Sequence, residues 1–141
     1  MKELRFLIAC SIILLCYNNA TAQDYSGTWT GIIIESTSDC KNIVKATPGK
    51  YRLTFAQRGD ELTIFENVVR RPYRGFIDAD SSGQVQVRGT YADNGGYITE
   101  EVFIKFANSN SGGGHSVWRW SDGWHQCGGR FQFTLNKDRS K

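Results

Sequence analysis

Apolar and polar residues alternate with a period of two along most of the chain that follows residue 22. Between residues 84 and 91, for example, Val85 and Val87 alternate with glutamines and an arginine. This period places successive side chains on opposite faces of a strand, whereas an amphipathic helix repeats every 3.6 residues. The pattern predicts eight strands, at residues 27–35, 51–57, 61–67, 73–79, 84–91, 97–107, 115–120 and 129–136.

Clusters of Gly, Asp, Asn and Ser separate these strands, as at Arg58-Gly59-Asp60 and at residues 108–114 and 121–123. Such clusters are typical of hairpin turns. Eight short antiparallel strands joined by hairpins close most economically into an up-and-down barrel, because closure removes the exposed edges. We therefore predict an all-β fold with a single antiparallel barrel domain over residues 23–141; a β-sandwich of the same strands is the alternative.

The barrel interior is predicted to be filled. A barrel of about eight strands has room only for packed side chains or for one small ligand. Many large residues are expected to point inward, and we expect them to leave no sizeable cavity. These residues are Phe55, Phe65, Tyr91, Phe106, Phe131 and Phe133.

The first 22 residues have the composition of a cleavable signal peptide. Lys2 and Arg5 precede an apolar run at residues 6–16, and Ala20-Thr21-Ala22 supplies a small-x-small cleavage site. The run is too short to cross a bilayer, which takes about 20 residues. We expect export to the periplasm or the exterior, with no stable membrane insertion afterwards. The alternative is a lipid anchor, because Leu7-Ile8-Ala9-Cys10 resembles a bacterial lipobox, although the apolar run continues beyond Cys10.

The charge balance excludes some classes of partner. The full sequence has 17 Lys and Arg and 14 Asp and Glu, a net charge of +3. Loss of Lys2, Arg5 and Glu3 with a signal peptide would lower this to +2. So weak a bias argues against a nucleic-acid binder and against a membrane-surface protein.

Export also changes what the cysteines imply. Cys10 and Cys16 would leave with the signal, so Cys40 and Cys127 remain as a pair. A pair in an oxidising compartment is expected to form a disulfide, for which loop entropy gives an upper value of roughly 4–5 kcal/mol. Neither histidine lies at metal-ligand spacing with these thiols, so no metal site is expected, and the sequence indicates no cofactor.

The segment Gly27-Thr28-Trp29, at the start of the first strand, resembles the Gly-x-Trp signature of lipocalins and avidins, the calycin-type barrels. In lipocalins a late arginine stacks on that tryptophan, and Arg130 on the last strand matches it. The resemblance implies that Gly27, Trp29 and Arg130 are structural residues that close one end of the barrel. The chain lacks the helix that lipocalins place before the last strand, and the residues by which avidins hold biotin are not found.

Two segments have the composition of a binding surface. Val69-Arg70-Arg71-Pro72-Tyr73-Arg74-Gly75 is the densest basic patch, and it is read either as a charged strand edge or as a docking site for acidic groups. The segment from Trp118 to His125 has three tryptophans within seven residues. Trp118 and Trp120 share one face of a strand and are expected in the core or beside a ligand with Tyr91, whereas Trp124 and His125 in the turn suit recognition of a partner.

Catalysis and calcium binding find little support. His115 and His125, or the adjacent Glu100 and Glu101, form no recognisable acid–base pair, so we predict a protein that is not an enzyme. The segment starting at Asp78 begins like a calcium loop, but Gly89 stands where the bidentate glutamate belongs.

Two functions remain as hypotheses. The first is a carrier that binds a small apolar or amphiphilic ligand through Tyr91, Trp118 and Trp120. The second is an exported interaction factor, of the inhibitor or immunity type, whose contacts with a protein partner are made by four residues: Arg70, Arg74, Trp124 and His125. The sequence does not indicate the oligomeric state.

Overall fold

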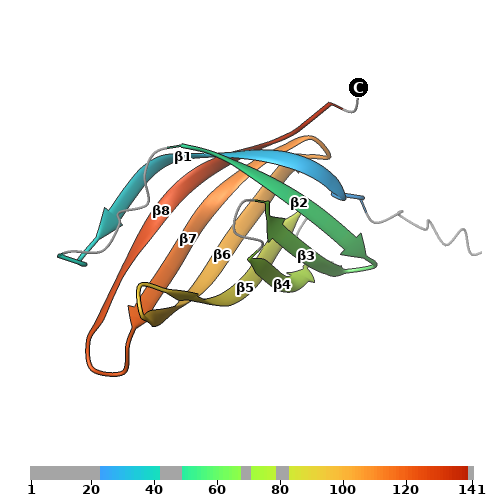
Figure 1. The fold of residues 1–141 in the computed structure, drawn as a ribbon. Helices are drawn as coiled ribbons and strands as arrows, with labels where there is room; N and C mark the ends of the chain where they lie inside the picture. Colours follow the sequence, from blue (N-terminus) through green and yellow to red (C-terminus); the bar gives the residue numbers. More distant parts are fainter. Residues whose placement is uncertain (1–22, 42–48, 68–70, 79–82, 140–141) are drawn as a thin grey trace, which may run out of the picture.

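The computed structural model describes residues 23–41, 49–67, 71–78 and 83–139, and it confirms the predicted all-β fold. Eight antiparallel strands pair in sequence order, and β8 closes on β1 to complete a barrel (Figure 1). None of the described residues form a helix long and apolar enough to cross a membrane. The strands are β1 (Gly27–Ser38), β2 (Lys50–Arg58), β3 (Glu61–Glu66), β4 (Pro72–Ile77), β5 (Gln84–Asp93), β6 (Gly96–Asn108), β7 (Ser111–Ser121) and β8 (Gln126–Lys137).

The barrel wall is uneven in height. β3 and β4 have 6 residues each, whereas β6 has 13 and β1 and β8 have 12 each. β1 arches between β2 and β8, and its ladder with β8 shifts register at a bulge between Ile33 and Glu35. A bulge increases the local twist and bend of a strand, which lets β1 pair with both neighbours.

The strand that precedes β8 is longer than predicted. β7 begins at Ser111, so Gly112, Gly113 and Gly114 lie inside the strand and not in a turn. The reason is close backbone approach: a Cβ at Gly114 would lie 1.9 Å from the Phe103 carbonyl oxygen. These glycines are therefore strand residues that allow β6 and β7 to come together.

One end of the barrel is plugged by aromatic rings; we call it the closed end. Trp29 has no exposed surface, and its indole Nε1 donates a hydrogen bond of 2.8 Å to the Tyr25 carbonyl oxygen. Its ring lies 5.1 Å from Phe55 and 5.4 Å from Phe106, while Tyr25 stacks on Phe106 at 3.7 Å. The tryptophan of the Gly-x-Trp segment therefore closes the barrel, as predicted.

The predicted partner of Trp29 is wrong. Arg130 is exposed and pairs with Thr37, near the far end of β1, whereas Trp29 pairs with Lys137. The Lys137 ammonium lies 5.8 Å from the centroid of the Trp29 ring and so takes the place expected for Arg130. Gly27 has a φ of 129°, and a Cβ there would lie 2.9 Å from the Lys137 side chain.

The opposite end, which we call the mouth, carries the disulfide. Cys40, just after β1, is bonded to Cys127 at the start of β8, which confirms the predicted pairing. The β5–β6 and β7–β8 turns lie at this same end, since the strands alternate in direction. The disulfide therefore fastens the barrel seam on the side away from the aromatic plug.

Some predictions fall on residues outside the described ranges. The signal peptide with Cys10, the arginine at position 70 and most of the calcium-like segment after Asp78 are among them. They stay predictions.

Candidate ligand-binding cavity

The barrel encloses a cavity of about 550 Å³ between the aromatic plug and the mouth. This overturns the expectation of a filled interior. Of the six large residues expected inside, Phe55 and Phe106 belong to the plug, and Phe65 points outward with 38 % of its surface exposed. The other three, Tyr91, Phe131 and Phe133, lie on the cavity wall and leave its middle open.

Most of the cavity wall is apolar. Aliphatic and aromatic side chains from all eight strands face it, and Gly31 widens it because a Cβ there would touch Leu53 and Leu135 at 3.4 Å. Such a lining suits the hydrocarbon part of a ligand. The apolar residues are Ile33, Leu53, Phe55, Ile64, Val87, Ile98, Val102, Ile104, Phe131, Phe133 and Leu135.

A polar cluster interrupts this lining at Glu100 on β6. The Glu100 carboxylate is only 4 % exposed and accepts hydrogen bonds from three hydroxyl groups. Tyr73 on β4 donates at 2.8 Å, Tyr91 on β5 donates at 3.1 Å, and Ser116 on β7 donates to the other carboxylate oxygen. We call these four residues the Glu100 cluster.

The cluster is built by strand register. Glu100 pairs with Gly89 on one side and with Trp118 on the other, so Tyr73 has to reach it across β5. Gly89 makes this possible, because a Cβ there would lie 2.8 Å from the Tyr73 ring. The small residue in β5 thus lets the Tyr73 hydroxyl meet the carboxylate two strands away.

Burial and the nearby carboxylate set the acidity of the two tyrosines. Burial raises the pKa of Tyr73 and of Tyr91 well above the usual value, and the negative charge of Glu100 raises both further. The guanidinium of Arg71 opposes this at Tyr91 by lowering its pKa, and it lies 3.7 Å from the centroid of that ring. Both hydroxyls therefore stay protonated, as donors, at neutral pH.

Further charged residues line the cavity. Glu66, at the end of β3, is 8 % exposed, so a second carboxylate lies on the wall. Arg71 and Asp93 are half-buried, while Lys50 is exposed at the mouth. Two of the three carboxylates are thus buried, and the cations stand nearer to solvent.

The residues predicted to bind a ligand are close together. Tyr91 and Trp118 both line the cavity. Trp120 is buried next to them, in a cluster with Ile98 and the Cys40 side of the disulfide, and its indole nitrogen donates to the Asp93 carbonyl oxygen at 2.8 Å. Trp120 therefore supports the wall near the mouth and does not itself line the cavity.

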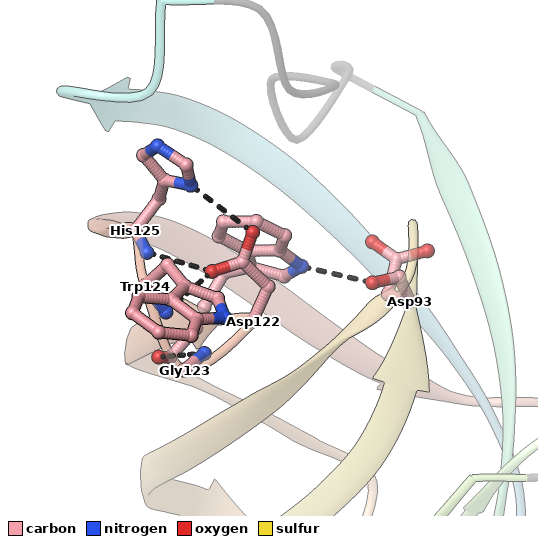
Figure 2. Close-up of polar contacts among 7 residues, drawn as sticks. Asp93, Asp122, Gly123, Trp124 and His125 are labelled. Carbon is pink, nitrogen blue, oxygen red and sulfur yellow. Dashed lines mark hydrogen bonds and ion pairs between the residues drawn. The ribbon is translucent and has the colours of Figure 1, made fainter.

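The β7–β8 turn presents the most exposed large hydrophobic side chain of the described residues. Trp124 is 91 % exposed, and the turn beneath it is held by Asp122 (Figure 2). One Asp122 carboxylate oxygen accepts from the backbone amides of Trp124 and His125 at 2.8 and 2.6 Å, and the other contacts the His125 ring at 3.2 Å. These amides and the ring lower the pKa of Asp122 to about 2.

The residues predicted to bind a partner do not form one surface among the described positions. Trp124 and His125 lie at the mouth, whereas Arg74 lies on the outer wall of β4, opposite Thr63 and Arg88. The arginine patch and the tryptophan turn are therefore separate features.

The sequence-based site omitted most of the Glu100 cluster. Glu100 and Glu101 lie on opposite faces of β6, as expected for adjacent strand residues, and Glu101 is half-exposed and pairs with Arg88. The available signal was a glutamate at an inward position of a strongly alternating strand. Its partners Tyr73 and Ser116 are distant in sequence and carry no comparable signal.

Comparison with family models, with curated proteins and with solved structures finds no match to this chain. Within the described ranges, the one group of side chains at metal-ligand distance is Asp39, Cys40 and Cys127. Both sulfurs of that group are engaged in the disulfide. The cavity is therefore the feature of this barrel that indicates a function.

Proposed function

We propose that this protein is an exported, non-enzymatic carrier, similar in its mode of binding to lipocalins and avidins, that holds one small apolar or amphiphilic molecule. The observation that carries the proposal is the cavity of about 550 Å³, plugged by Trp29 at one end and lined mainly by apolar side chains. Small-molecule sites are typically concave, mostly apolar spaces of about 300–1,000 Å³ with a few placed polar groups. The Glu100 cluster supplies such groups.

Export is part of the proposal. The Cys40–Cys127 disulfide is compatible with an oxidising compartment, because cytosolic proteins rarely keep such bonds. The composition of the first 22 residues supports the same destination.

Two variants on β6 test the proposal. Val102 lines the cavity, whereas Thr99 is exposed on the outer wall of the same strand. We expect Val102→Phe to weaken uptake of a neutral fluorescent probe, N-phenyl-1-naphthylamine, at least tenfold, because the added ring occupies ligand space. Thr99→Phe adds a similar volume outside and should leave uptake unchanged.

The measurement is probe fluorescence during titration of each folded variant, with mass spectrometry of the natively purified protein to detect a bound small molecule. The carrier proposal would be refuted if the wild-type protein neither took up the probe nor retained a small molecule.

A second function, recognition of a protein partner at the mouth, is favoured by Trp124. Its ring is 91 % exposed although its turn is held by several hydrogen bonds, and exposed aromatic residues on ordered turns are frequent binding hot spots. Crosslinking and pull-down from the exported fraction would test it, with Trp124→Ala compared with wild type and with Arg74→Ala, on the outer wall of β4, as the control. A partner recovered equally by Trp124→Ala and wild type would contradict this interface.

A further inference from the structure

The charges on the cavity wall have a consequence for the choice of ligand. Of the charged side chains that line the cavity, Glu66 and Glu100 are buried, whereas Lys50 is exposed and Arg71 and Asp93 are half-buried. A ligand head group that enters the barrel therefore meets negative charge inside it.

Glu100 is the more informative of the two carboxylates. Its three hydrogen-bond donors are neutral hydroxyls, and none of the ion pairs found among the described residues includes it. A buried carboxylate without a positive partner is costly, because its hydration is lost and only partly replaced. An ionised carboxylate has about four acceptor sites, so one remains when three hydroxyls have bound.

We infer that the cavity selects an amphiphile with a cationic amine head, and that Glu100 is the residue that determines this preference. The inference rests on the proposed carrier function. An ammonium group supplies both the missing positive charge and further N–H donors. The apolar wall would take the hydrocarbon part.

Aromatic rings near the carboxylate agree with this choice. Tyr73 and Tyr91 meet edge to face, with ring centroids 6.5 Å apart, and both line the cavity together with Trp118. Ring faces attract cations and repel anions. Arg71 lies on the Tyr91 ring and is the feature that would favour an anion; its half-exposed position puts that attraction towards the mouth.

The experiment uses three ligands of equal chain length that differ in charge at neutral pH: decylamine, decanol and decanoate. Each is titrated against the wild-type protein loaded with N-phenyl-1-naphthylamine, and its dissociation constant is obtained from displacement. We expect decylamine to bind about tenfold more tightly than decanol, because one good charge-assisted hydrogen bond accounts for a difference of that size. Decanoate should bind most weakly.

The variant Glu100→Gln tests whether Glu100 causes the preference for decylamine over decanol, and Glu101→Gln is the matched control. Glu100→Gln keeps the size of the side chain and removes its charge, so the preference for decylamine over decanol should fall to about twofold or less, while decanol affinity stays. Glu101 is the adjacent residue on the outer wall, paired with Arg88, and its substitution should leave the preference intact.

A measurement on the wild-type protein makes the test independent of how the variant folds. The side-chain carboxyl carbon of Glu100 should shift in the NMR spectrum when decylamine is added and much less when decanol is added. A shift confined to other carboxyl groups would overturn the role of Glu100.

The outcomes separate the two proposals. If decanol or decanoate displaces the probe at least as well as decylamine, the amine preference is wrong and the carrier stands. If the probe does not bind and none of the three ligands binds, the carrier itself fails. If folded Glu100→Gln still prefers decylamine over decanol to the same extent, Glu100 does not cause the preference.

Discussion

The two ends of the barrel contain similar residue types and use them differently. At the closed end, Tyr25, Trp29, Phe55 and Phe106 contact one another and leave no space. Towards the mouth, the two tyrosines of the Glu100 cluster donate to one buried carboxylate oxygen and border a cavity. The comparison teaches that aromatic content alone does not decide whether part of a small barrel is filled or hollow.

The largest difference between the ends is expected for their tryptophans. Trp29→Ala should lower the free energy of unfolding by about 3–5 kcal/mol, because it empties a fully buried site. Trp124→Ala removes a ring that is 91 % exposed and should change it by less than about 0.5 kcal/mol. Urea unfolding followed by circular dichroism measures both, and equal losses would contradict the contrast between plug and mouth.

The second largest effect on stability is expected from loss of the disulfide. Replacing Cys40 and Cys127 together by serine should cost about 2–4 kcal/mol, since the unfolded chain loses the constraint of a ring that spans 87 positions. The NMR signal of the Trp29 indole N–H should keep the slow hydrogen exchange of a buried group, because the bond lies at the mouth. Titration of the unfolded wild-type protein for free thiols is the check on the starting state: two reactive cysteines in residues 23–141 would mean that the bond is absent.

A pH-dependent effect should follow at the Glu100 cluster. The pKa values of Tyr73 and Tyr91 are raised in the folded protein, so stability is fully present below the unfolded tyrosine pKa of about 10 and is lost as pH rises above it. Near-ultraviolet absorbance should show that these two tyrosines ionise only when the barrel unfolds. The steep alkaline loss should be reduced in Tyr73→Phe, whereas Tyr97→Phe, on the exposed outer wall, should reproduce the wild-type curve.

The smallest effect is expected at the β7–β8 turn. Asp122 has a folded pKa of about 2, so its contribution is present above the unfolded value of about 3.9 and is lost as pH falls towards 2. NMR titration of its carboxyl carbon should give a midpoint near 2. His125→Ala should leave the pKa of Asp122 low, since the backbone amides of His125 and Trp124 are the largest causes. A return to the ordinary value in this variant would show that the ring is the main cause.

Local pattern was sufficient for the fold. Alternation and turn residues are short-range signals, and they located all eight strands and the order of the hairpins. These signals failed at Gly112–Gly114, which form part of β7 and not the predicted turn. Glycine occurs both in turns and where two strands approach closely, and the sequence alone does not distinguish the two. Leu62 and Ile64 point inward, so alternation along β3 predicts that Phe65 points outward, as it does. The prediction of an inward Phe65 was wrong because it relied on the residue being aromatic.

The site was harder to predict because it depends on distances across the barrel. Tyr91 and Trp118 were identified as ligand-facing and do line the cavity. The meeting of Glu100 with Tyr73 and Ser116 depends on the registers of four strands and on the missing side chain at Gly89. The prediction that Arg130 stacks on Trp29 was wrong for the same reason, because the register of β1 and β8 pairs Trp29 with Lys137.

The hydrogen bonds at the closed end have a consequence for protein engineering. The backbone amide of Asp138 donates to the Thr28 carbonyl oxygen, and the Thr30 hydroxyl donates to the Asp138 carboxylate, both at 2.8 Å. Residues on either side of the barrel seam are therefore neighbours, so a short linker between them permits circular permutation, with new ends opened at Gly59 in the β2–β3 turn. A surface tether fused at this seam would leave the mouth facing solution, which is the orientation a sensor needs.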